Sequence, residues 1–488
     1  MKARRAVRSA LCASTICAAT LSLITGCTVG PDYRLPDQAE LNSAAANGAF
    51  LAKDTDALKD DAVPARWWRL YEDEVLDALI ADALAANTDL RAAAAALARS
   101  AALLREAKIL RQPTVPIQAG LERSQFAGEQ FLLPIRPPVS NDYEVSITIG
   151  YDLDLFGAIR RGIEAAQADH EAVAAAQDLV RINVAAGTAR AYADVCGAGL
   201  ELATLRRSLE LQERSLELTR MLREAGRATE LDVTRSRQLV EQLQSFVPQL
   251  AAAQRNALYR LAALTGRAPA EIDEALLRCE SPPRLDQALP VGDGAALLRR
   301  RPDVRRAERQ LAAATAQIGV AVAQLYPDVQ LGAALGSLGR TADFLSAPTN
   351  FWNIGGLVNW QANRNGARAR VAAAEANAQL ALAGFDGVVL ESLRQIESAL
   401  NTYLHDLHRE QHLRAARDDA ASAAADARQL LIGGRATEIV VVDAERTLIA
   451  AEQSLAQVQV AIANDQIPVF LALGGGWISQ DAAPATAK

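Results

Sequence analysis

Alternating apolar and polar residues predict a strand hairpin in the first third of this chain. From Tyr143 to Leu153, apolar side chains occupy every odd position, and polar or small ones occupy every even position. This period of two predicts a β-strand with one apolar face. Its predicted partner is residues 115–126, so the hairpin covers residues 115–154.

A second predicted hairpin, residues 328–361, has the same aromatic spacing as the first. Tyr143 and Tyr151 lie eight positions apart on one apolar face, as do Trp352 and Trp360 on the other. Eight steps of about 3.3 Å span about 26 Å, close to the apolar band between the aromatic girdles of an outer-membrane barrel. This spacing favours strands that face lipid. The alternative is a soluble sandwich with aromatic residues in its core.

Long proline-free segments follow each hairpin and predict helices. Residues 158–247 and 366–467 contain no proline and are rich in strong helix formers. At 1.5 Å per residue, the segment 158–223 alone would be about 100 Å long. Gly226–Glu230 and Gly434–Glu438 have identical sequences and lie at predicted turns. The chain therefore contains two long helical hairpins, with tips near these two segments.

These matching elements indicate an internal duplication. An earlier match pairs Asp89-Leu90-Arg91 with Asp303-Val304-Arg305, and each copy continues with a strand hairpin and a long helical hairpin. We predict one domain with pseudo-twofold internal symmetry. Its segments are a signal peptide (1–26), a lipidated N-terminal arm (27–65), a first repeat (66–266), a connection (267–293), a second repeat (294–477) and a flexible tail (478–488).

The chain begins with the pattern of a secretory signal. Basic residues precede an apolar segment, residues 10–24, which is too short to span a bilayer. The segment leads into Gly26-Cys27, which resembles a bacterial lipoprotein signal in which Cys27 carries S-diacylglycerol and N-palmitoyl groups. Thr28, not aspartate, follows, so this resemblance implies sorting to the outer membrane. The alternative is that Cys27 is one more small residue of the leader.

Composition argues against several function classes. Loss of the four basic leader residues would change the formal charge from −7 to −11, which gives no support for nucleic-acid binding. No later segment has eighteen consecutive apolar residues, so no membrane-spanning helix is predicted. We find no GxSxG, HExxH, P-loop or CxxC motif, and no GxGxxG at a strand–helix junction, so neither enzymatic activity nor a cofactor is predicted. Cys196 and Cys279 could form a disulfide, but the sequence does not require one.

Three histidines form a possible metal-binding cluster. His405, His408 and His412 have the spacing i, i+3, i+7, which could place them on one helix face. The chain has only two methionines, so a methionine-rich copper path is not supported. A solvated helix face is the favoured interpretation, and no metal site is predicted.

The predicted strands require more than one copy of the chain. Four strands cannot close a barrel, and an open sheet edge cannot lie in lipid. Two, three or four copies would give about eight, twelve or sixteen strands, and eight would leave almost no bore. These arguments do not choose among the numbers of copies.

Motifs along nearly the whole mature chain resemble the outer-membrane factors of the TolC-like family, in its NodT/OprM-like lipoprotein branch. It is their order that makes them specific: CTVGPDY at 27–33, WW at 67–68, NTDL at 87–90, YDLDLFG at 151–157, LRRRPDV at 298–304 and ALGGGW at 472–477. The resemblance implies a mainly α fold with a small β part. It implies homotrimers, with four strands per chain in an outer-membrane β-barrel that continues as a long periplasmic helical barrel. One departure is residues 361–366, which lack the family's proline and aromatic residue at the last strand-to-helix bend.

The resemblance also implies the function and its partners. The protein would be the outer-membrane exit duct of a tripartite efflux system. It would pass drugs or other small molecules from an inner-membrane pump and a periplasmic adaptor protein to the outside. Two alternatives remain open: a protein-secretion outlet of the same fold, and a non-conducting structural periplasmic lipoprotein.

The resemblance places a gate just beyond the second tip. Ile439, Asp443 and Arg446 have the spacing i, i+4, i+7, so they share a helix face. They match the apolar residue, aspartate and arginine of the family's periplasmic constriction. In the first hairpin, Asp232 matches a residue that helps to latch the closed state. The alternative is that Asp443 and Arg446 are ordinary solvated residues.

The tips match the surfaces that meet the adaptor in relatives. The tip residues concerned are small or basic: Gly226, Arg227, Gly433, Gly434 and Arg435. Glycine also permits a tight turn between helices, and both interpretations can hold. Because alanine occupies the position of the arginine that can partner the latch aspartate, Arg435 is the candidate replacement.

Overall fold

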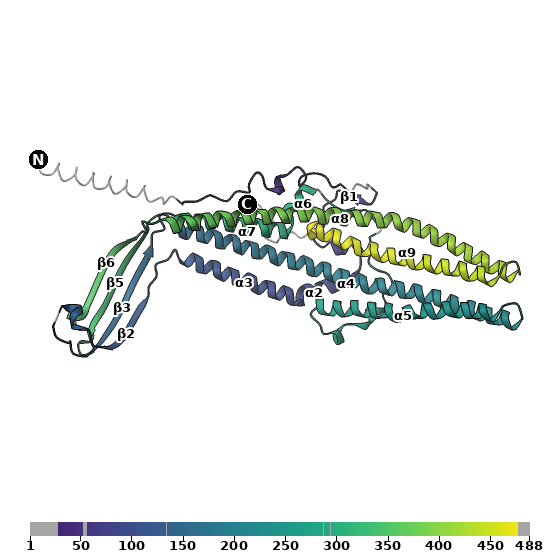
Figure 1. The fold of residues 1–488 in the computed structure, drawn as a ribbon, viewed down its shortest axis with the longest axis horizontal. Helices are drawn as coiled ribbons and strands as arrows, with labels where there is room; N and C mark the ends of the chain where they lie inside the picture. Colours follow the sequence, from purple (N-terminus) through teal and green to yellow (C-terminus); the bar gives the residue numbers. More distant parts are fainter. Residues whose placement is uncertain (1–27, 52–55, 133, 286, 293, 477–488) are drawn as a thin grey trace. The chain divides into compact units, whose positions relative to one another are not determined.

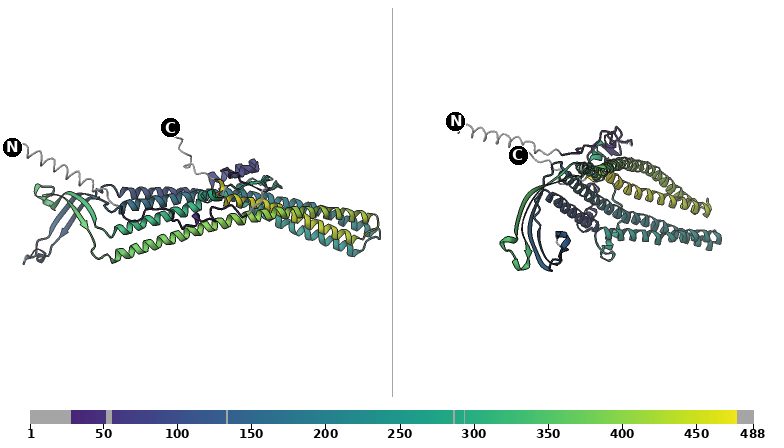
Figure 2. Two further views of the ribbon diagram at one scale, coloured as in Figure 1. Left: turned by 90° about the horizontal axis from the view of Figure 1, so that it is seen from above. Right: turned by 60° about the vertical axis from the view of Figure 1, so that its left-hand side comes forward.

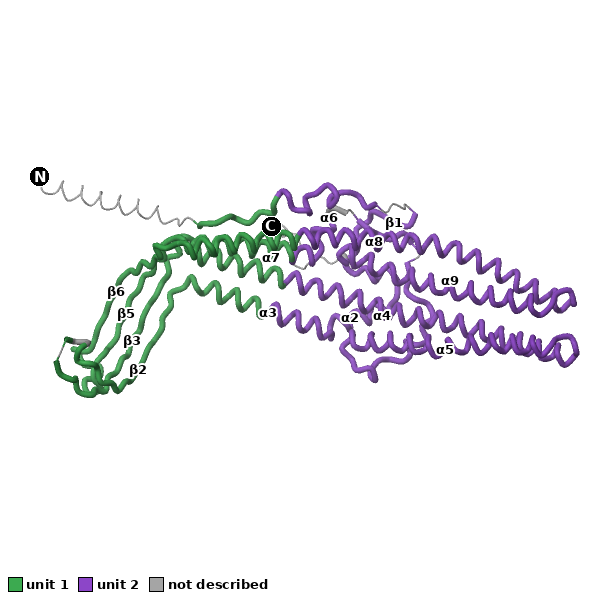
Figure 3. Tube along the Cα trace, in the orientation of Figure 1, with its two compact units in different colours: residues 1–36, 98–173, 307–385 green, residues 37–97, 174–306, 386–488 purple. Residues whose placement is uncertain are grey.

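The computed structural model describes residues 28–476 except 52–55, 133, 286 and 293. The predicted leader, Cys27 and the predicted tail lie outside the described residues. The chain divides into two compact units, shown in two colours in Figure 3. The first contains residues 1–36, 98–173 and 307–385, and the second contains residues 37–97, 174–306 and 386–488.

The helices and strands follow the same order in both halves of the chain (Figure 1). The first half contains α2 (Glu74–Ala86), α3 (Thr88–Ile109), β2 (Ile117–Ser124), β3 (Ser140–Asp152), α4 (Ala158–Glu224) and α5 (Glu230–Leu264). The second contains α6 (Gly294–Arg300), α7 (Pro302–Ala323), β5 (Asp328–Arg340), β6 (Asn350–Asn359), α8 (Asn365–Ile432) and α9 (Glu438–Ala472). The short elements are η1 (Glu40–Asn42), β1 (Leu58–Lys59), η2 (Trp67–Tyr71), η3 (Gly128–Phe131), η4 (Pro269–Glu271), η5 (Glu274–Arg278), β4 (Leu289–Pro290), η6 (Thr341–Asp343), η7 (Ala347–Thr349) and η8 (Gly474–Gly476).

A four-stranded antiparallel sheet forms part of the first unit. Its order is β2-β3-β5-β6, so the two hairpins, β2-β3 and β5-β6, pair side by side through β3 and β5. Along β3, Ile147 and Ile149 are 42% and 45% exposed. Ser146, which points to the opposite face, is 4% exposed. The predicted alternation therefore gives β3 an uncovered apolar face. Among the described residues, none of the helices combines the length and apolarity of a membrane span.

The spacing predicted that Tyr143 lies on an exposed aromatic face, and this prediction is wrong. Its side chain is 2% exposed, and its hydroxyl lies 2.7 Å from Ser337 Oγ and accepts a hydrogen bond from the Leu345 N–H at 2.7 Å. The Phe344 ring lies 4.7 Å from the Tyr143 ring, so the loop after β5 covers this end of β3. The other three aromatic residues of the pattern are exposed: Tyr151, Trp352 and Trp360.

The N-terminal arm is held in the first unit by Arg161 of α4. The side chain of Arg161 is 4% exposed. Its guanidinium donates to Asp32 Oδ1 at 2.8 Å and to the carbonyls of Val29 and Gly30 at 3.2 and 3.1 Å. A buried guanidinium is stable only when its donors are satisfied, which explains why the arm is ordered here.

The bend between β6 and α8 is made without proline. Trp360 Nε1 donates to the Leu325 carbonyl at 3.2 Å, and the Arg364 guanidinium lies 5.7 Å from the Trp360 ring centre. Asn363 Oδ1 accepts a hydrogen bond from the Asn365 N–H at 3.2 Å, at the first residue of α8. Hydrogen bonds of Trp360 and Asn363 therefore stabilise the bend in place of the proline and aromatic residue expected from the family.

The second unit contains α5, α9 and the parts of α4 and α8 from residues 174 and 386 onwards, so the tip ends of both helical hairpins lie in it side by side (Figure 2). Each hairpin has its own apolar contacts: Leu216, Val233 and Val240 in the first, and Ala420, Ala424 and Leu448 in the second. A further cluster joins them and consists of Leu205, Leu239, Leu243 and Ile449. Both α5 and α9 continue through a proline, Pro248 or Pro468. The helices therefore extend beyond the proline-free segments of the sequence.

Two further features stabilise the second unit. Trp67 lies in the 3₁₀ helix η2, and its ring stacks on that of Phe470 in α9 with ring centres 4.7 Å apart. Cys196 of α4 forms a disulfide with Cys279, which follows η5. The sequence left this pairing open, and the structure resolves it.

Candidate functional site

The two hairpin tips have the same backbone geometry. Gly226 and Gly434 have φ angles of 71° and 69°. In both tips the N–H of the following arginine, Arg227 or Arg435, donates at 2.8 Å to the carbonyl five residues earlier. This is the Schellman arrangement, in which a left-handed glycine ends a helix. Turn geometry alone therefore requires both glycines, whatever else they contact.

The predicted tip residues are exposed and lie close together. Arg227, Gly433, Gly434 and Arg435 are all exposed, as is Gly226. A Cβ atom added at Gly434 would lie 3.6 Å from Arg227 Nη2, so the two tips are neighbours. Together they form a small, basic, solvent-facing surface.

The three predicted gate residues lie in the first turns of α9. Ile439 is 53% exposed, and Asp443 and Arg446 are exposed as well. Their spacing places them on one face of the helix, as predicted. Within the part of the chain that the structure describes, neither Asp443 nor Arg446 forms an ion pair. Both charges are therefore available to groups outside this chain.

Asp232 is engaged within its own hairpin. Its carboxylate accepts hydrogen bonds from the Thr229 N–H at 2.9 Å and from Thr229 Oγ1 at 2.6 Å, and Thr229 Oγ1 accepts from the Asp232 N–H at 3.3 Å. This is a capping box at the start of α5. The hydrogen bonds from Thr229 lower the pKa of Asp232. Among the described residues, Arg435 is not an ion-pair partner of Asp232.

The sequence did not predict that Glu438, next to the predicted gate residue Ile439, is buried. Glu230 and Glu438 occupy equivalent positions of the repeated tip sequence, but their surroundings differ. Glu230 is exposed and pairs with Arg223 at 2.6 Å. Leu431 stands where the second hairpin would need that arginine, and Glu438 instead turns inward and accepts a hydrogen bond from Thr219 Oγ1 of α4 at 2.5 Å. Burial raises the pKa of Glu438 because it removes water from the carboxylate.

Two more glutamates continue this line along α9. Glu445 is 4% exposed and accepts a hydrogen bond from Arg428 Nε of α8 at 2.8 Å. Glu452 accepts a hydrogen bond from Ser208 Oγ of α4 at 3.1 Å. We call Glu438, Glu445 and Glu452 the acidic seam. Their seven-residue spacing was the signal in the sequence that could have revealed it.

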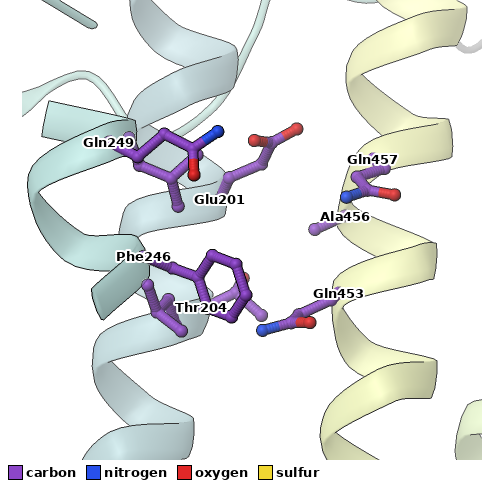
Figure 4. A pocket seen from close by; sticks show the side chains of 9 residues that line it. Glu201, Thr204, Phe246, Gln249, Gln453, Ala456 and Gln457 are labelled. Carbon is purple, nitrogen blue, oxygen red and sulfur yellow. The ribbon is translucent and has the colours of Figure 1, made fainter. Parts of the chain in front are cut away.

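A cavity of about 290 Å³ lies between the first hairpin and α9 (Figure 4). Its lining combines an aromatic ring, amides and a carboxylate: Glu201, Phe246, Gln249, Gln453 and Gln457. Burial raises the pKa of Glu201. The cavity is amphipathic, and the Glu201 carboxylate has no hydrogen-bond partner among the described residues.

The three clustered histidines lie on α8 and are exposed: His405, His408 and His412. Among the described residues, no group of three His, Cys, Asp or Glu side chains is arranged to hold a metal ion.

Solved structures with the same arrangement are outer-membrane channels. The outer-membrane channel OprN is 34% identical, with a TM-score of 0.86, and the match covers 92% of this chain and 100% of that one. The outer membrane protein VceC from Vibrio cholerae is 25% identical, with a TM-score of 0.78 and coverage of 85% and 99%. The predicted fold class is confirmed.

The family profile described as "Outer membrane efflux protein" matches residues 79–267 and 295–475, and the chain belongs to this family. Similar proteins include Nodulation protein T of Rhizobium leguminosarum bv. viciae, 27% identical, with coverage of 96% of this chain and 93% of the relative. The toluene efflux pump outer membrane protein TtgF of Pseudomonas putida is 28% identical, with coverage of 95% and 97%. The pyoverdine export outer membrane protein OpmQ of Pseudomonas aeruginosa is 29% identical, with coverage of 94% and 97%.

The predicted family, efflux function and outer-membrane location are thereby confirmed. The protein is an outer-membrane efflux channel, and its family is one of channels rather than enzymes. Efflux takes precedence over the two alternatives, a protein-secretion outlet and a non-conducting lipoprotein, because the family profile is that of an outer membrane efflux protein and two of the relatives are named as efflux or export proteins.

Proposed function

We propose that this chain works as a homotrimeric exit duct whose periplasmic mouth is gated by Ile439, Asp443 and Arg446. One observation carries the proposal: the three side chains are exposed on one face of α9, beside the tips, and neither charge forms an ion pair with a described residue. In a trimer, three carboxylates and three guanidiniums would approach a common axis. Opposite charges in a narrow, partly desolvated constriction attract more strongly than on an open surface.

The tips provide the docking surface for a periplasmic adaptor, which links the channel to an inner-membrane pump. The support is the exposed backbone at Gly226 and Gly434 and the two neighbouring arginines. The exported compounds are small organic molecules, because the named relatives export toluene or pyoverdine. Crosslinking from residue 226 or 434 in cells should capture the adaptor, and capture from exposed Leu380 on α8 instead would argue against tip docking.

Cys27 would carry the lipid anchor, with S-diacylglycerol and N-palmitoyl groups. The support is the leader followed by Gly26-Cys27, and the residue itself lies outside the described part of the chain. Cys27→Ser should abolish acyl labelling and reduce assembly in the outer membrane. Normal acyl labelling of this variant would refute the assignment.

The gate is tested with Asp443→Ala combined with Arg446→Ala. Loss of both charges should raise single-channel conductance in planar bilayers and increase dye leakage in cells. A suitable control is Glu217→Ala with Arg220→Ala, an exposed ion pair near the tip of α4. The pair Arg414 and Asp418, farther from the tip on α8, is not a suitable control because Arg414 donates to buried Glu410. If trimers of this variant assemble and their conductance is unchanged, Asp443 and Arg446 are ordinary solvated residues and the gate assignment is wrong.

A further inference from the structure

The contact between the two hairpins combines apolar with polar contacts, as does the interior of each hairpin, where Gln212 contacts Ser236 in the first and Arg428 contacts Glu445 in the second. Inside each hairpin, apolar side chains pack together. Between them, one apolar cluster that includes Ile449 is flanked by polar contacts on both sides. One is Thr219 with Glu438, and the other is Ser208 with Glu452. Both polar contacts between the hairpins include a glutamate carboxylate, so a change of charge at either one alters how firmly the hairpins hold together.

Glu438 has an unusual environment for a carboxylate. It is 8% exposed, and its Oε1 accepts the hydrogen bond from Thr219. Its Oε2 has no hydrogen-bond partner among the described residues. The charged groups that act on it are Asp232 from α5 and Glu445 from α9, and both are acidic. The Arg428 guanidinium of α8 is bound to Glu445. A negative charge on Glu438 is therefore opposed both by burial and by its neighbours.

We propose that Glu438 is a positioning residue of the gate, which joins the second hairpin to the first through Thr219 and sets by its protonation state how firmly the two hold together. The inference rests on the proposed gate, because Glu438 directly precedes Ile439 in the first turn of α9. When Glu438 is protonated, no negative charge is buried beside Asp232 and Glu445, and the seam stays packed. When it is ionised, separation of the hairpins rehydrates the carboxylate, so the gate opens more readily.

The direction of the pH effect follows from the raised pKa of Glu438 in the packed seam. If the hairpins separate, this pKa returns towards the ordinary glutamate value of about 4.3. The closing contact is therefore fully present below that ordinary value and is lost as pH rises through the raised pKa. The open fraction of the channel should increase with pH over this window.

Two substitutions should move the gate in opposite directions. Glu438→Gln keeps an acceptor for Thr219 and supplies donors at the unpartnered position, so it should lower the open fraction at high pH and flatten the pH profile. Thr219→Val keeps the shape of the side chain but removes the one hydrogen bond that a described residue makes to the Glu438 carboxylate. It should raise the open fraction about tenfold, which corresponds to about 1.4 kcal/mol.

The internal duplication offers a matched control. Glu230→Gln changes the equivalent glutamate of the first tip, which is exposed and paired with Arg223, and should leave the open fraction and its pH profile unchanged. Thr219→Ser restores the hydroxyl and should restore the parent behaviour. Assembly of each variant is checked by the trimer band on a semi-native gel.

The measurement is single-channel recording of the full-length trimer between about pH 4 and pH 8, a range set around the ordinary glutamate pKa. A parent-like pH profile for Glu438→Gln would overturn the inference, as would changes of the same sign in Glu438→Gln and Thr219→Val. If Asp443→Ala with Arg446→Ala raises conductance while the seam variants do not, the seam inference fails and the gate survives. If the parent protein forms no channel, the proposed function itself fails.

Discussion

Thr229 and Thr437 occupy the same position of the repeated tip sequence but play different parts in their helices. Thr229 caps α5, because its Oγ1 accepts from the Asp232 N–H and Asp232 completes the capping box. Thr437 precedes α9, and its side chain forms no cap bond with any described residue. Val440 stands where the second hairpin would need the aspartate of the box. The capping box therefore forms at the start of α5, which has Asp232, and is absent at the start of α9, which has Val440 at the same position.

Thr229→Ala should therefore weaken the first turn of α5 by about 1 kcal/mol, the usual contribution of a helix cap. Thr437→Ala should have a clearly smaller effect on α9. Hydrogen exchange of the amides that follow each threonine measures both. Equal loss of protection in the two hairpins would contradict the assignment of the cap to Thr229.

The same cap has a predictable pH dependence. Hydrogen bonds from Thr229 lower the pKa of Asp232, so their stabilising effect is present above the ordinary aspartate value of about 3.9. It is lost as pH falls through the lowered pKa. The acidic seam responds in the opposite sense, because burial raises the pKa of Glu438. Acidification thus weakens a local cap and strengthens the contact between hairpins.

At the scale of the strand, β3 turns one apolar face outwards. Ile147→Arg should cost about 2–4 kcal/mol, because it places a charge on the face expected to meet lipid near the bilayer midplane. Thr148→Arg, one position along on the opposite face, should cost much less. Ser146, on the same face as Thr148, is not a suitable control because it is buried in the sheet. Folded, heat-modifiable trimer in outer-membrane fractions measures the effect, and equal losses at both positions would refute the alternation.

Elements whose pattern is local could be predicted, and contacts between distant segments could not. The period of two located β3, and the proline-free segments located the long helices. The burial of Tyr143 depends on Ser337 and Leu345, which lie 194 and 202 positions away. The shared, exposed helix face of Ile439, Asp443 and Arg446 followed from helical spacing, whereas the inward turn of Glu438 depends on Thr219. The identical sequence around Glu230 gave no sign of that difference.

At the scale of the whole molecule, the duplication supplies one architecture with two divergent copies. The family profile matches two segments, one in each half, and each contains a strand hairpin and a long helical hairpin. The first copy retains the capped tip and the exposed ion pair of Arg223 and Glu230. The second carries the proposed gate residues and the buried glutamates of the acidic seam. The two tips therefore share a sequence and a turn geometry but differ in the contacts of their glutamates.

The disulfide provides a last test, which concerns the stability of the chain. Cys196 and Cys279 are 83 positions apart, and the loop they close contains the tip of the first hairpin, all of α5 and the start of the connection. A crosslink over such a loop restricts the unfolded chain, and its loss from a folded protein typically costs about 2–5 kcal/mol. Reduction should therefore lower the thermal midpoint of the parent protein. Cys196→Ala with Cys279→Ala should start from the lower midpoint and show no further response to reductant. An unchanged midpoint in parent protein whose thiols are shown to be free by mass spectrometry would mean that the bond adds nothing to stability.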